Sequence, residues 1–228
     1  MNNIPENIKF ETREEVKEIL ERLGKDLNRL CSLIRKNLVP TERNVIIHSI
    51  VAQSSAEVER FGFFYNKQTP KELLAWISRN LFELNVVLRY ALKDEDNVLK
   101  FRNQLASDQI EVLEGILEIS ENPTDEMVFS TKSRIEDLKK LIQPTVERGR
   151  LPRNLSSMAK EVGLLREYKA FYKLYSKYVH PSAYLLLAAP DATQSFETES
   201  IFLMNIQIYA WDTYLRASKG LGIKINHE

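Results

Sequence analysis

Long stretches of this sequence repeat apolar residues every three or four positions, and few glycines or prolines interrupt them. The segment 12–40 shows this clearly, because its apolar residues fall on one stripe of a helix with 3.6 residues per turn. Seven glycines and eight prolines occur in 228 residues, and no run with the strand period of two is bounded by hairpin turns. The sequence therefore predicts an all-α fold, a single-domain bundle of seven or eight helices.

Helix caps and breaks divide the chain into consecutive segments. Thr69 followed by Glu72 has the spacing of a capping box, and Gly163 and Gly220 are expected to end the helices that precede them. We expect one helical domain over 1–228, made of a long helix in 1–40, four helices in 41–142, a basic loop at 143–154, and the tyrosine-rich and C-terminal apolar helices in 155–219.

Composition limits the compartment and the chemistry. The polar N-terminal segment lacks the apolar core of a secretory signal, so we expect a cytoplasmic protein. The longest apolar run, 183–189, is far shorter than the roughly 20 residues of a membrane helix, so we expect no membrane partner. One cysteine and three histidines are too few for the common zinc sites, and no Glu-x-x-His pair of a di-metal bundle occurs. We expect neither a metal nor another cofactor.

The most unusual segment is 164–189, which contains five of the nine tyrosines. Tyr172, Ser176 and His180 are spaced four apart and fall along one stripe of a helix, close to Lys173, so the four side chains can share a site. The proline that follows His180 disfavours helical geometry there and has no N–H. The helix should therefore end at His180.

A second candidate group lies on the helix expected from Thr69 to Leu92. Arg79 and Glu83 are four residues apart among many apolar residues. At the surface such a pair contributes a few tenths of a kcal/mol, whereas in a core it needs partners on another helix. Because most of this helix must face inward, we favour the buried arrangement. We then expect the pair to bond to the tyrosine-rich helix and not only to itself.

The zero net charge hides an asymmetry along the chain. The segment 94–126 has ten acidic and two basic residues, and the segment 132–177 has twelve basic and five acidic residues. The basic segment could bind RNA or a nucleotide phosphate, or it could pair with the acidic helix of the same or a second chain. We favour internal pairing, because the chain has no glycine-rich phosphate loop or nucleic-acid motif. The final helix, 198–219, and the tyrosine-rich helix are both apolar enough to predict a homo-oligomer through one of them.

Two segments together resemble a known family. They are SRNLFELNVVLRYAL, with Arg79 and Glu83, and EYKAFYKLYSKYVHPSAYLL, with Tyr175 and His180. Both are similar to segments of bacterial helical proteins classed as a domain of unknown function, over roughly residues 40–215. The resemblance implies an all-helical fold and a pocket in which Arg79, Glu83 and His180 approach each other, with no established activity.

A more distant similarity is to the HEPN superfamily of helical ribonucleases and nucleotide-binding proteins, often toxins or abortive-infection components. Their active site has an arginine, then four to six intervening residues, then a histidine on a late helix. Before His180 only Lys173 is cationic at those positions, and a lysine lacks the planar fork of arginine. If the activity applied here, His180 would be a general acid or base, and Lys173 or Arg79 would stabilise the phosphorane charge.

Two hypotheses follow. The first is a non-enzymatic interaction or regulatory module with a protein partner, for example in a phage-defence or toxin-type system, in which Arg79, Glu83, Tyr175 and His180 form a buried polar network. The second is a metal-independent ribonuclease or nucleotide-binding protein with the same residues at an open cleft. Solvent access to His180 distinguishes them. The candidate catalytic residues are His180, Lys173, Arg79 and Glu83, and the candidate binding residues are Tyr172, Tyr175, Ser176, Arg148, Arg150 and Arg153.

Overall fold

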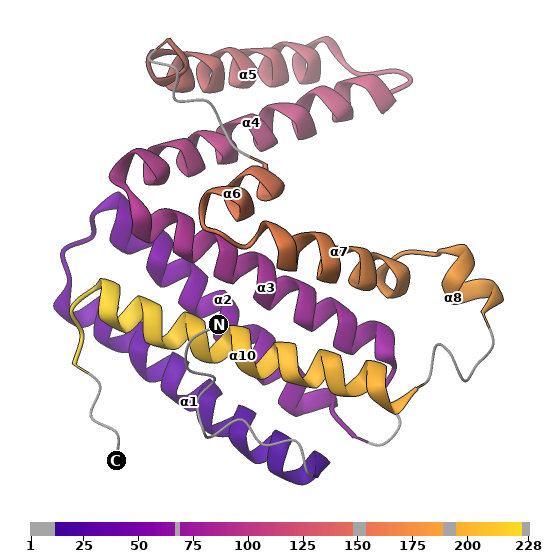
Figure 1. Cartoon of the computed structure of the whole chain (residues 1–228). Helices are drawn as coiled ribbons and strands as arrows, with labels where there is room; N and C mark the ends of the chain where they lie inside the picture. The colour runs from indigo at the N-terminus through magenta and orange to yellow at the C-terminus, as the bar shows by residue number, and fades with distance from the viewer. Residues whose placement is uncertain (1–11, 67–68, 148–153, 189–194, 225–228) are drawn as a thin grey trace.

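The structure, a computed structural model, describes residues 12–66, 69–147, 154–188 and 195–224 (Figure 1). These ranges contain α-helices and no strand, which confirms the predicted fold class, and eight of the helices are at least seven residues long. In the same ranges no helix has the length and apolarity needed to cross a membrane. The helices are α1 (Arg13–Asn37), α2 (Glu42–Phe64), α3 (Lys71–Lys93), α4 (Glu95–Ile119), α5 (Asp125–Val146), α6 (Leu155–Glu161), α7 (Leu165–Val179), α8 (Ala183–Leu187) and α10 (Phe196–Gly220).

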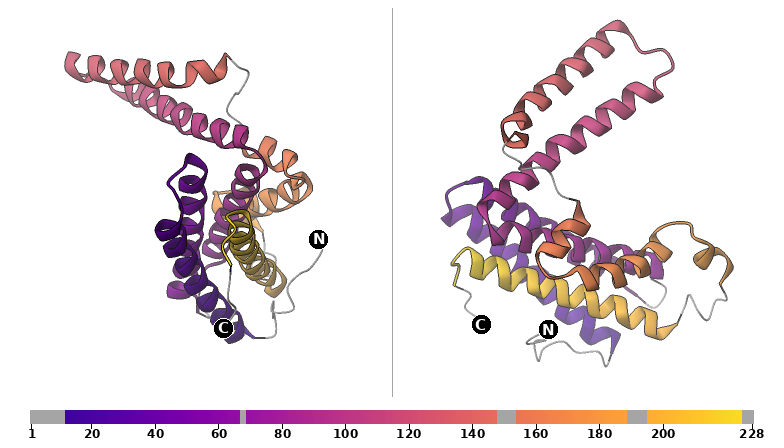
Figure 2. Two further views of the ribbon diagram at one scale, coloured as in Figure 1. Left: turned by 90° about the vertical axis from the view of Figure 1, so that its left-hand side faces the viewer. Right: turned by 45° about the horizontal axis from the view of Figure 1, so that its top comes forward.

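Helices α3 and α10 form the centre of the helical body. They pack along each other, with α1 and α2 on one side and α6 and α7 on the other (Figure 2). Large side chains from these layers are fully buried, among them Phe61, Phe82, Tyr90, Tyr175 and Phe202. Most apolar residues of α10 are thus covered within the chain, with Phe196 and Leu215 as exposed exceptions, so the apolar composition of this helix is largely explained by packing within the chain.

The start of α3 differs from the prediction. Pro70, not Thr69, is the N-cap residue, and no side chain caps this helix. The Thr69 hydroxyl accepts a hydrogen bond from the backbone N–H of Asn66 at 2.7 Å and donates to the carbonyl of Phe64 at 2.9 Å. Thr69 therefore closes the turn before α3, since its side chain is already engaged there.

The end of α5 also differs from the prediction. The expected loop begins at Gln143, but α5 continues through Pro144 to Val146. A proline removes one backbone donor, and near the end of a helix this interrupts only the last turn. The rest of the expected loop, with Arg148, Arg150 and Arg153, lies outside the described residues.

Left-handed glycines end two helices. Gly163 follows α6 with φ 78°, and its N–H donates to the carbonyl of Lys160 at 3.3 Å, as expected for a glycine C-cap. This turn leads directly into α7. At the end of α10, Gly220 is still helical, and Gly222 with φ 65° takes the left-handed conformation two residues later than predicted.

Helices α4 and α5 form a hairpin that projects from the body, and we call it the arm (Figure 2). Its base is fastened to α6, because Lys93 Nζ and Asn97 Nδ2 both donate to Glu161 Oε1, at 3.3 and 3.0 Å. Its two helices share a small core of their own, made of Ala106, Ile110, Ile135 and Leu138.

The arm does not show the expected pairing of the acidic and basic segments. In the described residues, α4 forms its ion pairs with α2, through Glu95 with Arg43 and Arg102 with Glu42. The lysines of α5 that form ion pairs do so with carboxylates of α5 itself. Apolar packing and the hydrogen bond from Asn103 Nδ2 to Thr145 Oγ1 therefore hold α4 against α5, and Asp108, Glu111 and Glu118 of α4 are exposed to solvent.

Candidate functional site

Arg79 contacts three of the predicted site residues, Glu83, His180 and Tyr172. Its Nε donates to Glu83 Oε1 at 2.8 Å, and its Nη1 lies 3.3 Å from Nε2 of His180. The guanidinium carbon lies 4.9 Å from the centroid of the Tyr172 ring, which is a cation–π distance. The Arg79–Glu83 pair thus contacts the tyrosine-rich helix α7, as the sequence led us to expect.

The Arg79–Glu83 pair is half-buried, whereas we expected it to be buried. The side chains are 20% and 31% exposed. Burial alone would lower the pKa of Arg79, but the hydrogen bond and the charge of Glu83 outweigh it and raise this pKa above its ordinary value. The guanidinium therefore stays charged and borders on solvent.

His180 is exposed at the end of α7. Its backbone is extended, with φ −116° and ψ 148°, so the helix ends at the residue before Pro181 as predicted. An arginine has donors and no acceptor, so the contact with Arg79 is a hydrogen bond only when His180 Nε2 accepts it. Such a hydrogen bond requires the tautomer with the proton on Nδ1, in which Nε2 is the acceptor.

An open pocket of about 360 Å³ lies between α3, α6 and α7. Tyr168 and Tyr172 stack in its wall with ring centroids 4.9 Å apart. Asn154 is at the start of α6, where its Oδ1 accepts from the N–H of Ser157 at 2.9 Å. The lining residues are Arg79, Glu83, Asn154, Leu155, Ser156, Tyr168 and Tyr172.

Sequence reasoning missed four of these lining residues. Tyr168 could have been found, because it lies one helical turn before Tyr172 and so falls on the same face. Asn154, Leu155 and Ser156 gave no such signal. They reach the pocket only because α6 packs against α3, which is a tertiary contact.

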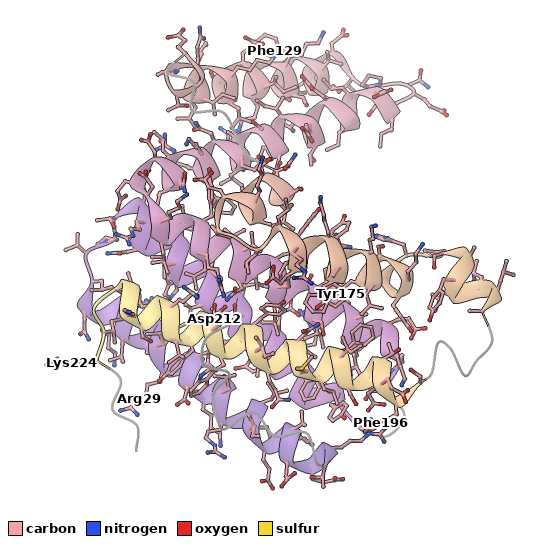
Figure 3. All side chains as sticks on the ribbon, in the orientation of Figure 1. Arg29, Phe129, Tyr175, Phe196, Asp212 and Lys224 are labelled. Atoms are coloured by element: carbon pink, nitrogen blue, oxygen red, sulfur yellow. The ribbon has the colours of Figure 1, made fainter. Side chains whose placement is uncertain are left out.

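Tyr175 and Ser176 do not join the pocket. Tyr175 is fully buried between α7 and α10, where its hydroxyl accepts from Asn205 Nδ2 at 2.9 Å (Figure 3). Burial raises the pKa of Tyr175 far above its ordinary value. Ser176 Oγ donates to the carbonyl of Lys173 on its own helix at 3.0 Å. The expected buried network is therefore not formed, because Tyr175 faces the core while His180 faces solvent.

A row of cations runs along the exposed face of α7 and ends near His180. Arg166, Lys169, Lys173 and Lys177 follow each other at spacings of three or four residues, and all four are exposed. Within the described part of the chain, none of them forms an ion pair. We call this row the basic ridge. The pocket tyrosines lie beside it on the same helix.

Comparison with known proteins places this site in a family. Residues 75–189, just over half of the chain, match a family of unknown function, DUF5677. The chain belongs to this family. No curated protein and no solved structure matches it. The DUF5677 segment begins near the start of α3 and ends after α8, so it includes Arg79, Glu83, the arm, the basic ridge and His180.

Proposed function

We propose that this DUF5677 protein is a non-enzymatic module that binds single-stranded RNA along the basic ridge. One observation carries this proposal: the four cations of the basic ridge are exposed, and none of them has a carboxylate partner among the described residues. Clustered cations attract the phosphate backbone, because neutralising phosphates releases the counterions condensed on them. Cations already paired with carboxylates would offer much less of this affinity.

The pocket next to the ridge suits one nucleotide of such a strand. Arg79 has five N–H donors, and its bonds to Glu83 and His180 use two of them, which leaves donors for a phosphate or a base. The stacked rings of Tyr168 and Tyr172 provide an aromatic wall. A basic surface beside aromatic side chains is the usual arrangement in proteins that bind single strands with little sequence preference.

Metal-independent RNA cleavage at His180 is the second candidate. Two observations support this candidate: His180 is exposed, and it contacts Arg79. The guanidinium of Arg79 is a planar cation, and no arginine occupies the motif positions that precede His180 in the sequence. Binding is the better-supported function, because in the tautomer that bonds to Arg79 the acceptor nitrogen of His180 is engaged, and a general base needs that nitrogen to take a proton from the ribose 2′-hydroxyl.

The ridge can be tested with labelled single-stranded uridine oligonucleotides in EDTA, by fluorescence anisotropy over a series of salt concentrations. We expect wild-type protein to bind with an affinity that falls steeply with salt. Replacing Lys169, Lys173 and Lys177 together by alanine should lower the slope of log K against log salt by about 2, because each lost phosphate contact contributes about 0.7.

A matched control removes the same charge from the arm. Replacing Lys132, Lys139 and Lys140 of α5 by alanine should leave RNA affinity and its salt slope nearly unchanged. Equal losses in both triple variants would mean that net charge, and not the ridge, drives binding. Running the same samples on a denaturing gel tests the second candidate, because strand breaks that disappear in His180→Ala would make the protein a ribonuclease.

A further inference from the structure

Helix α4 has two apolar faces, and only one of them is covered. The inner face packs on α5 and contains Ala106 and Ile110. The outer face consists of Leu105, Val112, Ile116 and Ile119, which are 59%, 61%, 39% and 79% exposed.

The four outer residues form one stripe along the arm. Their spacings of seven, four and three residues keep them within about 60° of each other on a helix that turns 100° per residue. Isolated apolar residues are common on protein surfaces, but an aligned, exposed row typically marks an interaction site. We call this row the outer stripe. The arm projects from the body, so the stripe is accessible along its length (Figure 2).

One border of the outer stripe is acidic. Asp108, Glu111 and Glu118 lie on the side of α4 away from α5, and all three are exposed. Asp108 accepts a hydrogen bond from Gln104 at 2.6 Å, and none of the three forms an ion pair within the described residues. We call these residues the acidic border. The lysines of α5 that form ion pairs, Lys139 and Lys140, bond to carboxylates of α5 itself and not to the acidic border.

A second copy of the chain is a poor partner for this surface. A two-fold interface brings the same patch of both copies together. If two α4 helices paired antiparallel through their outer stripes, the acidic border of one copy would face the acidic border of the other. Juxtaposed like charges disfavour such a complex. On the opposite border α5 limits the approach of another helix.

We propose that the outer stripe of the arm docks a basic amphipathic helix of another protein. The apolar face of that helix would cover Leu105, Val112, Ile116 and Ile119, and its lysines or arginines would lie along the acidic border. Helix-in-groove recognition of this kind takes its affinity from the apolar anchors and its choice of partner and orientation from the charges. The arm is a different part of the molecule from the pocket and the basic ridge, so the two proposals can fail independently.

The probe is a synthetic helical peptide with leucines on one face and lysines on both borders, labelled with a fluorophore. The same peptide with glutamates in place of the lysines is its charge control. Anisotropy with the full chain should show binding of the lysine peptide only. Val112→Ser with Ile116→Ser should weaken it at least tenfold, and Glu111→Gln with Glu118→Gln should weaken it and reduce its salt dependence.

Matched substitutions elsewhere make the result specific. Phe129→Ser with Leu141→Ser removes two exposed apolar residues from α5, and Glu14→Gln with Glu18→Gln removes two exposed carboxylates from α1. Both should bind the lysine peptide like wild type, with unchanged circular dichroism.

Three results would overturn the proposal: equal binding of the glutamate peptide, wild-type affinity in the Val112→Ser, Ile116→Ser variant, or equal weakening in the control variants. Sedimentation tests the alternative occupant. A wild-type dimer that the outer-stripe variant converts to a monomer would show that a second copy covers the stripe.

Discussion

Neighbouring tyrosines of α7 face different surroundings. Tyr172 and Tyr175 are three residues apart on this helix, yet Tyr172 lies under the Arg79 guanidinium and Tyr175 bonds to Asn205 in the core. The four-residue spacing predicted that Tyr172 and His180 share a face, and helix geometry alone suffices for that. The sequence could not show which side the core covers, because that depends on where α3 and α10 pack.

The exposure of the Arg79–Glu83 pair sets the size of its contribution to stability. We expect Glu83→Gln to lower the free energy of unfolding by about 1 kcal/mol, since a half-exposed charged hydrogen bond is partly replaced by water. Urea denaturation followed by circular dichroism measures this. The substitution keeps the shape of the side chain, so the change reports the charge.

Two other carboxylates calibrate that result. Glu57 is 1% exposed and accepts from Arg60 at 2.6 Å and from Asn80 at 3.1 Å, so Glu57→Gln should cost about 1.5–3 kcal/mol. Glu136 is 61% exposed in its pair with Lys139, and Glu136→Gln should have no measurable effect. If Glu83→Gln matched Glu136→Gln, the pair would contribute nothing to the packing of α7 on α3.

At the scale of helices, the sequence predicted the positions of most elements and missed some of their ends. The break at His180 followed from Pro181, whose chemistry acts locally. The start of α3 was misplaced because Thr69 bonds to residues of the preceding turn, which a capping pattern does not reveal. Pro144 predicts a break, but the helix continues for two residues beyond it. These errors arise where side chains have alternative local partners.

Replacing glycine by alanine should lower stability in the turn between α6 and α7 and raise it within α4. Gly163 has φ 78°, and an added Cβ would meet no atom within 4 Å, so Gly163→Ala should cost about 1 kcal/mol through backbone strain alone. Gly115 lies within α4, where a Cβ also has open space, and Gly115→Ala should stabilise by about 0.5–1 kcal/mol. Chemical denaturation of the two variants compares them. Destabilisation by Gly115→Ala would contradict the helical geometry of the arm.

At the scale of the whole molecule, the layering of the helices was beyond what the sequence could predict. Apolar periodicity indicated helices with buried faces, but α10 could equally have been central or part of an interface. The structure places it against α3, with α1 beside it, and ties the first helix to the last through Glu199. This carboxylate accepts from Arg13 Nε and Nη2, both at 2.9 Å, and from Lys71 Nζ at 3.4 Å.

Glu199 should make stability depend on pH in the acidic range. Burial alone would raise its pKa, but the hydrogen bond and charge of Arg13 and the charge of Lys71 outweigh it, so the folded-state pKa lies below the ordinary value of 4.5. A depressed pKa gives stability that is fully present above 4.5 and is lost as the pH falls through the folded-state pKa. Glu199→Gln should therefore destabilise by about 3 kcal/mol at neutral pH, since Lys71 is left buried without its counter-charge.

The measurement is the difference in unfolding free energy between wild type and Glu199→Gln at several pH values. This difference should be constant above about pH 5 and should become smaller as the pH falls below 5. A difference that stays constant down to acid unfolding would mean that the carboxylate charge is not what joins α1 to α10.

The hydrogen bonds between the base of the arm and α6 predict where family members differ in length. Because Glu161 of α6 bonds to Lys93 and Asn97 where α3 passes into α4, the body is joined at that point without any contribution from the tip of the arm. Whole turns could be inserted or deleted around 119–124 without moving Arg79 or α7. Members of this family should therefore differ in length at the tip of the arm and be constant in length at its base, so that lineages could change what the arm binds while inheriting the same pocket.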